Sequence, residues 1–194
     1  KEPMREAIIL VKEKMDRKKL AEFKSVSECP KEVKNVFFAL MAIFNKPPTW
    51  DQVRSYLQNI SYEELCDVEH LKVTQNGNFK KITDFSRKFD LDVLRNQSSM
   101  IPDLAQYIQC VEKYFKAKWT AEIKENEYLE NSKKYRESCA ILDELQRKLN
   151  ELLKEIEDLE KQYREAKDKL NQLKVQGDDI KKKIGRASSL TSAF

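Results

Sequence analysis

The feature that most constrains this chain is a heptad repeat in its C-terminal third. From Leu142 to Ile184 apolar residues recur at alternating intervals of three and four positions, and nearly all positions between them are charged or amide residues. Such spacing gives a narrow apolar seam, which is typical of a coiled-coil strand. Only Gly177 interrupts the seam, which consists of Leu142, Leu145, Leu149, Leu152, Ile156, Leu159, Tyr163, Ala166, Leu170, Leu173, Ile180 and Ile184.

The repeat weakens toward its N-terminal side. Ala121, Tyr128 and Tyr135 keep every seventh position. The alternate positions are polar: Lys124, Asn131 and Ser138. We expect one helix from about Trp119 to Ile184, which would be on the order of 100 Å long at about 1.5 Å per residue.

Composition limits what the rest of the chain can be. With 36% charged residues among 194 and three glycines, the chain favours helices around a small core. No apolar run is long enough to span a membrane. The four cysteines, which show no Cys-x-x-Cys spacing, are expected to be free thiols: Cys29, Cys66, Cys110 and Cys139. The net charge of +4 permits an acidic partner without requiring one.

Enzyme signatures are missing from the sequence. There is no glycine-rich phosphate loop, and no cluster of residues has metal-ligand spacing. The single histidine, His70, lies in a polar stretch and is expected to be a surface residue. We therefore expect no catalytic site, cofactor or metal.

The sequence predicts an all-α fold: a small helical head at the tip of an antiparallel coiled-coil stalk, with a long returning helix. Residues 1–23 are predicted to form the outgoing strand, 24–117 the head, 118–184 the returning strand, and 185–194 a flexible tail. In the head, helices are expected over 31–45, from the N-caps Thr49 and Ser61, and over 91–97, and residues 79–89 are expected to form a short helix or an irregular segment. The last head helix is expected to run directly into the stalk.

The outgoing strand is too short to cover the seam. About 22 residues can pair only with the first third of the returning strand, so an exposed apolar seam remains from Leu142 onward. An exposed apolar surface of this length is unfavourable in water and is expected to be covered by a partner. Either the remainder of an outgoing strand or a second copy is expected to pair with residues 142–184.

Basic residues of the head are the candidates for binding. Lys24, Lys31 and Lys34 flank the first head helix, and Lys80, Lys81 and Arg95 lie in the second half of the head. These are either ordinary solvated side chains or one surface that binds an acidic polymer.

Several segments together resemble the microtubule-binding domain of dynein heavy chains. Leu20 to Ser25, followed by Pro30 and Val33-Lys34, resembles the entry to that domain. Trp50-Asp51 with Val53-Arg54-Ser55 resembles its second helix, and Arg95 to Ser98 with Tyr107 to Tyr114 resembles its last helix. Glu2-Pro3 and the Met4, Ile8, Val11 repeat resemble the outgoing stalk strand near the tip.

The resemblance implies a head that grips the microtubule, with the far end of the stalk joined to an ATPase ring. In that family the two stalk helices slide past each other, and the slide switches microtubule affinity. Lys34 matches a lysine with which the family contacts tubulin. The resemblance further implies a cytoplasmic, cytoskeletal location, including the ciliary axoneme, and neither nucleic acid nor membrane as partner.

Two other interpretations remain open from the sequence. One is a dimeric coiled-coil structural or adaptor protein with a small helical head and no polymer to bind. The other is a helical arm that grips structured RNA, for which binding through phosphates would require more positive charge and would weaken steeply with salt.

Overall fold

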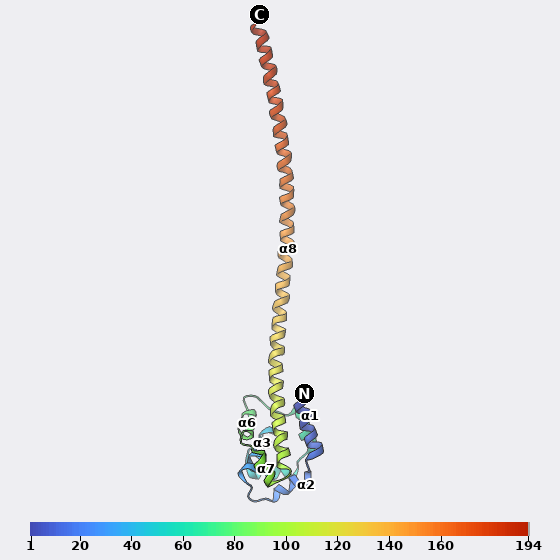
Figure 1. The fold of residues 1–194 in the computed structure, drawn as a ribbon, viewed down its shortest axis with the longest axis vertical. Helices are drawn as coiled ribbons and strands as arrows, with labels where there is room; N and C mark the ends of the chain where they lie inside the picture. The colour runs from blue at the N-terminus through green and yellow to red at the C-terminus, as the bar shows by residue number, and fades with distance from the viewer. Residues whose placement is uncertain (194) are drawn as a thin grey trace. The chain divides into compact units, whose positions relative to one another are not determined.

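The chain is all-α, as predicted, and the computed structural model describes residues 1–193 (Figure 1). It divides into two compact units, Lys1–Asn126 and Glu127–Phe194. Within the described residues, no helix combines the length and the apolar character needed to cross a membrane. The helices are α1 (Glu2–Ile9), α2 (Arg17–Glu22), α3 (Lys31–Ile43), α4 (Trp50–Gln58), α5 (Tyr62–Cys66), α6 (Asn78–Ser86), α7 (Leu91–Gln97) and α8 (Ile101–Ser192).

The core of the first unit forms around the start of α8. Along these first turns the buried side chains point in several directions, and Tyr107 is completely buried. Its hydroxyl donates a hydrogen bond to the Leu65 carbonyl at the end of α5 (2.9 Å). α3 is likewise buried over most of its circumference, because its sequence is apolar on nearly every side. These two helices are the centre on which the shorter ones pack.

Asn78 fixes α6 against α3. Its buried side-chain amide donates to the carbonyls of Ala42 (2.9 Å) and Lys72 (3.1 Å), while its oxygen accepts from the Thr74 amide (2.9 Å). One asparagine thus satisfies backbone groups at the end of α3 and in the loop before α6.

Polar side chains also tie α6 to α8. The Glu112 carboxylate accepts from Ser86 (2.6 Å) and Lys116 (2.6 Å). Burial alone would raise the pKa of this carboxyl, but the bonds from Lys116, Ser86 and Thr83 outweigh burial and hold the pKa below its usual value. Glu112 is therefore an ionised, nearly buried anchor between the two helices.

The N-terminal segment differs from the single strand expected over residues 1–23. α1 is followed by a π-helical turn, Leu10–Lys14, and the chain becomes extended at Met15 and Asp16 before α2. The Asp16 side chain accepts from the Lys18 amide (2.9 Å) and so starts a new helix, while the Tyr62 hydroxyl donates to the Met15 carbonyl (2.7 Å). Both interactions satisfy backbone groups outside one continuous helix, which explains the break.

This segment packs within the head and does not reach the returning strand. Ala7 and Val11 are completely buried, and the Cys110 thiol lies 3.6 Å from the Glu6 carboxylate. From Ile123 onward the large apolar side chains of α8 are exposed. The expected pairing of residues 1–23 with the first third of the returning strand is therefore wrong, and these residues join the compact unit that ends at Asn126.

Other local expectations hold. Thr49 and Ser61 accept from the amides of Gln52 (3.4 Å) and Glu64 (3.3 Å), as predicted for N-caps. The last head helix continues without a break into the long one. All four cysteines are free thiols, as expected.

The C-terminal end of α8 differs from the expected flexible tail over 185–194. The helix continues through Ser192, and Phe194 lies outside the described residues. The hydroxyls of Ser189 and Thr191 donate to carbonyls one turn earlier (2.9 and 2.7 Å). Because these hydroxyls bond within the helix and no proline is present, the serine-rich composition does not end it.

Asn78→Ala is expected to destabilise the head by about 2 kcal/mol, because it removes the side-chain hydrogen bonds to two carbonyls and one amide in a buried site. Urea unfolding followed by circular dichroism measures the change. Asn76→Ala, on the exposed turn just before, is the matched control and is expected to have little effect. Equal stability of the two variants would show that the Asn78 network does not hold α6.

Candidate functional site

Three of the candidate cations lie around the start of α3. Lys24 belongs to the 3₁₀ turn Phe23–Ser25, and Lys31 and Lys34 lie in the first turns of α3. The turn is held over α3 by the rings of Phe23 and Phe37, whose centroids are 5.2 Å apart. Lys24 and Lys31 are exposed and Lys34 is half-buried.

The segment between Lys24 and α3 is fastened by Trp50. Its indole N–H donates to the Val26 carbonyl (2.9 Å), and its ring packs edge-on against Phe37 with centroids 5.7 Å apart. α4 therefore fixes the path of the chain beside the basic residues. Because this segment is held in place, Lys24 at its start has a defined position on the surface.

The charge of Lys34 affects the pKa of the neighbouring Cys29 thiol. Burial raises the pKa of Cys29 to about 11, and the positive charge of Lys34 opposes that rise. Cys29 is thus a neutral thiol at physiological pH. Because Cys29 is buried and Lys34 is half-buried, the Lys34 ammonium lies at the boundary between the core and the surface.

Arg95 lies on α7, which packs against α3. Asp90 caps α7 through the amides of Asp92 (3.1 Å) and Val93 (3.2 Å). The Arg95 guanidinium, however, donates to the Asp92 carboxylate (2.9 Å), and both side chains are exposed. Arg95 therefore lies on a helix that contacts α3, and its charge is partly neutralised on its own helix.

Lys80 and Lys81 do not join this group. α6 runs antiparallel to α3, since Asn78 bonds to Ala42 while Phe85 packs on Phe38 with ring centroids 5.7 Å apart. The first turn of α6 thus lies beside the end of α3, about 12 Å along the axis from Lys34 at about 1.5 Å per residue. The six candidates form two separate groups.

α6 begins beside the part of α8 that leads out of the head. The ring of Phe79 packs edge-on against Trp119, with centroids 4.8 Å apart. Within the first unit, α2 and α7 lie near the opposite end from the N-terminus (Figure 1). The group that lies away from the N-terminus is called the basic end below. It consists of Lys24, Lys31, Lys34 and Arg95.

His70 is exposed and its ring nitrogen lies 2.6 Å from the Asp67 carboxylate, a hydrogen bond that raises the pKa of the histidine. Among the described residues there is no cluster of three histidine, cysteine or acidic side chains suited to a metal ion.

No protein-family model, curated protein or solved structure matches this chain.

The Cys29 pKa gives a pH prediction. The folded state holds the Cys29 proton more tightly than an unfolded chain, whose cysteine pKa is about 8.5. The contribution of Cys29 to the free energy of unfolding is therefore complete below about pH 8.5 and is lost as pH rises through about 11. Lys34→Gln removes the opposing charge, so it is expected to raise the pKa of Cys29 further.

Alkylation followed by mass spectrometry measures this effect. At about pH 8.5 we expect Cys139, on the second unit, to react before Cys29, and Lys34→Gln to slow Cys29 further. In denaturant all four thiols should react alike. Equal rates for Cys29 and Cys139 in the folded chain would contradict the assigned environment.

Proposed function

We propose that this chain is the microtubule-binding head of a dynein-type motor with part of its coiled-coil stalk. The observation that carries the proposal is the antiparallel placement of the N-terminal segment beside the start of α8. Glu6 lies by Cys110, and the groove between them is also lined by Lys14 and Gln106. A chain that enters and leaves a small head side by side has the connectivity of a domain at the tip of a helical hairpin.

The basic end supports the choice of partner. The exterior of a microtubule is strongly acidic, so a head that grips it needs exposed cations at the end away from the stalk. Lys24, Lys31 and Lys34 come from two adjoining segments and Arg95 from a third that packs on the same helix. Electrostatic attraction of this kind speeds encounter and fixes orientation.

The weak part of the seam supports a switchable stalk. Lys124, Asn131 and Ser138 occupy positions where leucine would lock the pairing register. A partner helix can therefore shift past this stretch at low cost. Because the N-terminal segment is buried in the head core, a shift of the stalk would be felt by the head directly.

In this proposal the ATPase lies in the motor ring at the far end of the stalk. The chain itself binds tubulin and transmits the state of the stalk. It works on the cytoskeleton, in the cytoplasm or in a ciliary axoneme.

Lys34→Glu is expected to weaken microtubule binding by about tenfold, since it places a negative charge on the basic end opposite an acidic surface. Co-sedimentation with microtubules at two salt concentrations measures the change. The free energy of unfolding should fall by less than about 1 kcal/mol, because Lys34 is not enclosed in the core.

Lys81→Glu is the matched control. It makes the same change of charge on an exposed lysine of α6, in the group that the fold separates from the basic end. We expect a much smaller loss of binding. Undiminished binding by folded Lys34→Glu, or an equal loss in both variants, would remove the basic end as the gripping surface, and a wild-type chain that fails to pellet would overturn the proposed function.

A further inference from the structure

The charges beside the seam of the second unit are sorted by sign. We write the heptad as abcdefg, with Leu142 at a and Leu145 at d, so that the e and g positions flank the seam. Over residues 161–184 these flanking positions hold only lysine and glutamine: Gln162, Lys167, Lys169, Lys174, Gln176, Lys181 and Lys183. The acidic residues of the same stretch all occupy the outer b, c and f positions: Glu165, Asp168, Asp178 and Asp179.

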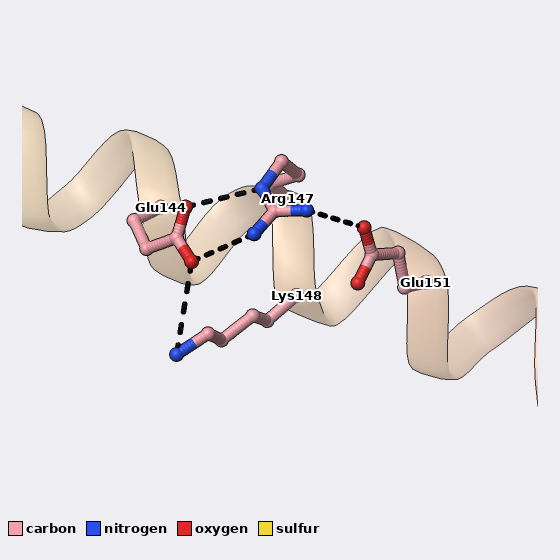
Figure 2. A network of polar contacts seen from close by, with 4 residues as sticks. All are labelled: Glu144, Arg147, Lys148 and Glu151. Carbon is pink, nitrogen blue, oxygen red and sulfur yellow. Dashed lines mark hydrogen bonds and ion pairs between the residues drawn. The ribbon is translucent and has the colours of Figure 1, made fainter.

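The preceding stretch of α8 is different because Arg147 and the flanking Lys148 pair with carboxylates of the same helix. Figure 2 shows the Arg147 guanidinium between the carboxylates of Glu144 (2.8 Å) and Glu151 (2.7 Å). Lys148, which flanks the seam, also reaches Glu144 (3.7 Å). The flanking lysine of this stretch therefore already has a countercharge on its own helix.

The five flanking lysines of residues 161–184 have no such countercharge. Each is exposed, and none makes an ion pair within residues 1–193. Glu165 and Asp179 stand one turn before Lys169 and Lys183, a spacing that permits pairing, yet neither pair lies within ion-pair distance. The apolar seam between them is also uncovered, with Leu170 52% and Leu173 63% exposed.

A parallel second copy does not satisfy these lysines. In a parallel coiled coil each g residue faces the following e residue of the other helix. That arrangement sets Lys169 against Lys174 of the copy and Glu155 against Glu160 of the copy. Like charges repel at both places, and no flanking pair attracts.

An antiparallel second copy also brings like charges together, because each g residue then faces a g residue and each e residue faces an e residue. Where the two lysine-rich stretches overlap, Lys174 faces Lys167 or Lys174 of the copy. Registers that bring Glu155 or Glu160 opposite a lysine also bring another like-charged pair together. Self-association is therefore disfavoured in both orientations.

We propose that the seam of residues 161–184 binds a helix that is not a second copy and that carries glutamate or aspartate at its flanking positions. Leucine and isoleucine on this helix cover the seam, while its carboxylates pair with Lys167, Lys169, Lys174, Lys181 and Lys183. In coiled coils such flanking pairs determine which helices associate.

The source of this helix rests on the proposed function: it is the outgoing helix of the stalk. The pairing chemistry does not depend on microtubules. The two statements can therefore fail separately.

The test uses the full chain and two synthetic helices with identical leucine and isoleucine heptads. One carries glutamate at every flanking position and the other carries lysine. Fluorescence anisotropy at about 0.05 M and about 0.5 M salt is expected to show the glutamate helix binding about tenfold more tightly at low salt, with the difference shrinking at high salt.

Matched charge reversals identify the lysines. The variant Lys167→Glu/Lys174→Glu/Lys181→Glu changes three e positions and is expected to reverse the preference. The control Lys154→Glu/Lys161→Glu/Lys182→Glu changes three outer f positions by the same charge and is expected to leave the preference intact.

Equal affinity for the two helices, or an equal effect of the two triple variants, would overturn the inference. So would a tight dimer of the chain in sedimentation equilibrium that excludes both helices. A chain that selects the glutamate helix but does not pellet with microtubules supports the acidic partner and overturns the proposed function instead.

Discussion

The burial of the first turns of α8 is the constraint on which the head depends. Tyr107 lies at zero exposure with its hydroxyl on the Leu65 carbonyl, and Glu112 remains ionised among Ser86, Thr83 and Lys116. An unpaired buried hydroxyl or carboxylate is costly, so these bonds set where α5 and α6 lie. The shorter helices have few residues each and acquire their positions from this helix.

The same helix meets a different requirement in the second unit. Its apolar residues there form a narrow stripe, too narrow for a globular core and suited to one partner helix. The lysines beside that stripe narrow the choice of partner further. A second copy brings lysine against lysine, whereas an acidic-flanked helix would neutralise them.

The N-terminal segment connects the start of α8 with the basic end of the head. It is buried against α8 in the head, where Glu6 faces Cys110. The extended residues Met15 and Asp16 separate it from the basic end. Under the proposed function, a shift of this segment would act on α2 and the Lys24 turn through a short connection.

The sequence by itself determined what depends on local period and local hydrogen bonds. The heptads from Leu142, the caps at Thr49 and Ser61, and the all-helical fold all follow from residues within a few turns of one another. Tertiary structure decided the rest. The break at Met15 requires Tyr62, which is 47 residues away, and the separation of Lys80 and Lys81 from Lys34 follows from the antiparallel packing of α6 on α3. Surface lysines carry no periodic signal of which other element they face, so only packing between distant segments could divide the six candidates into two groups.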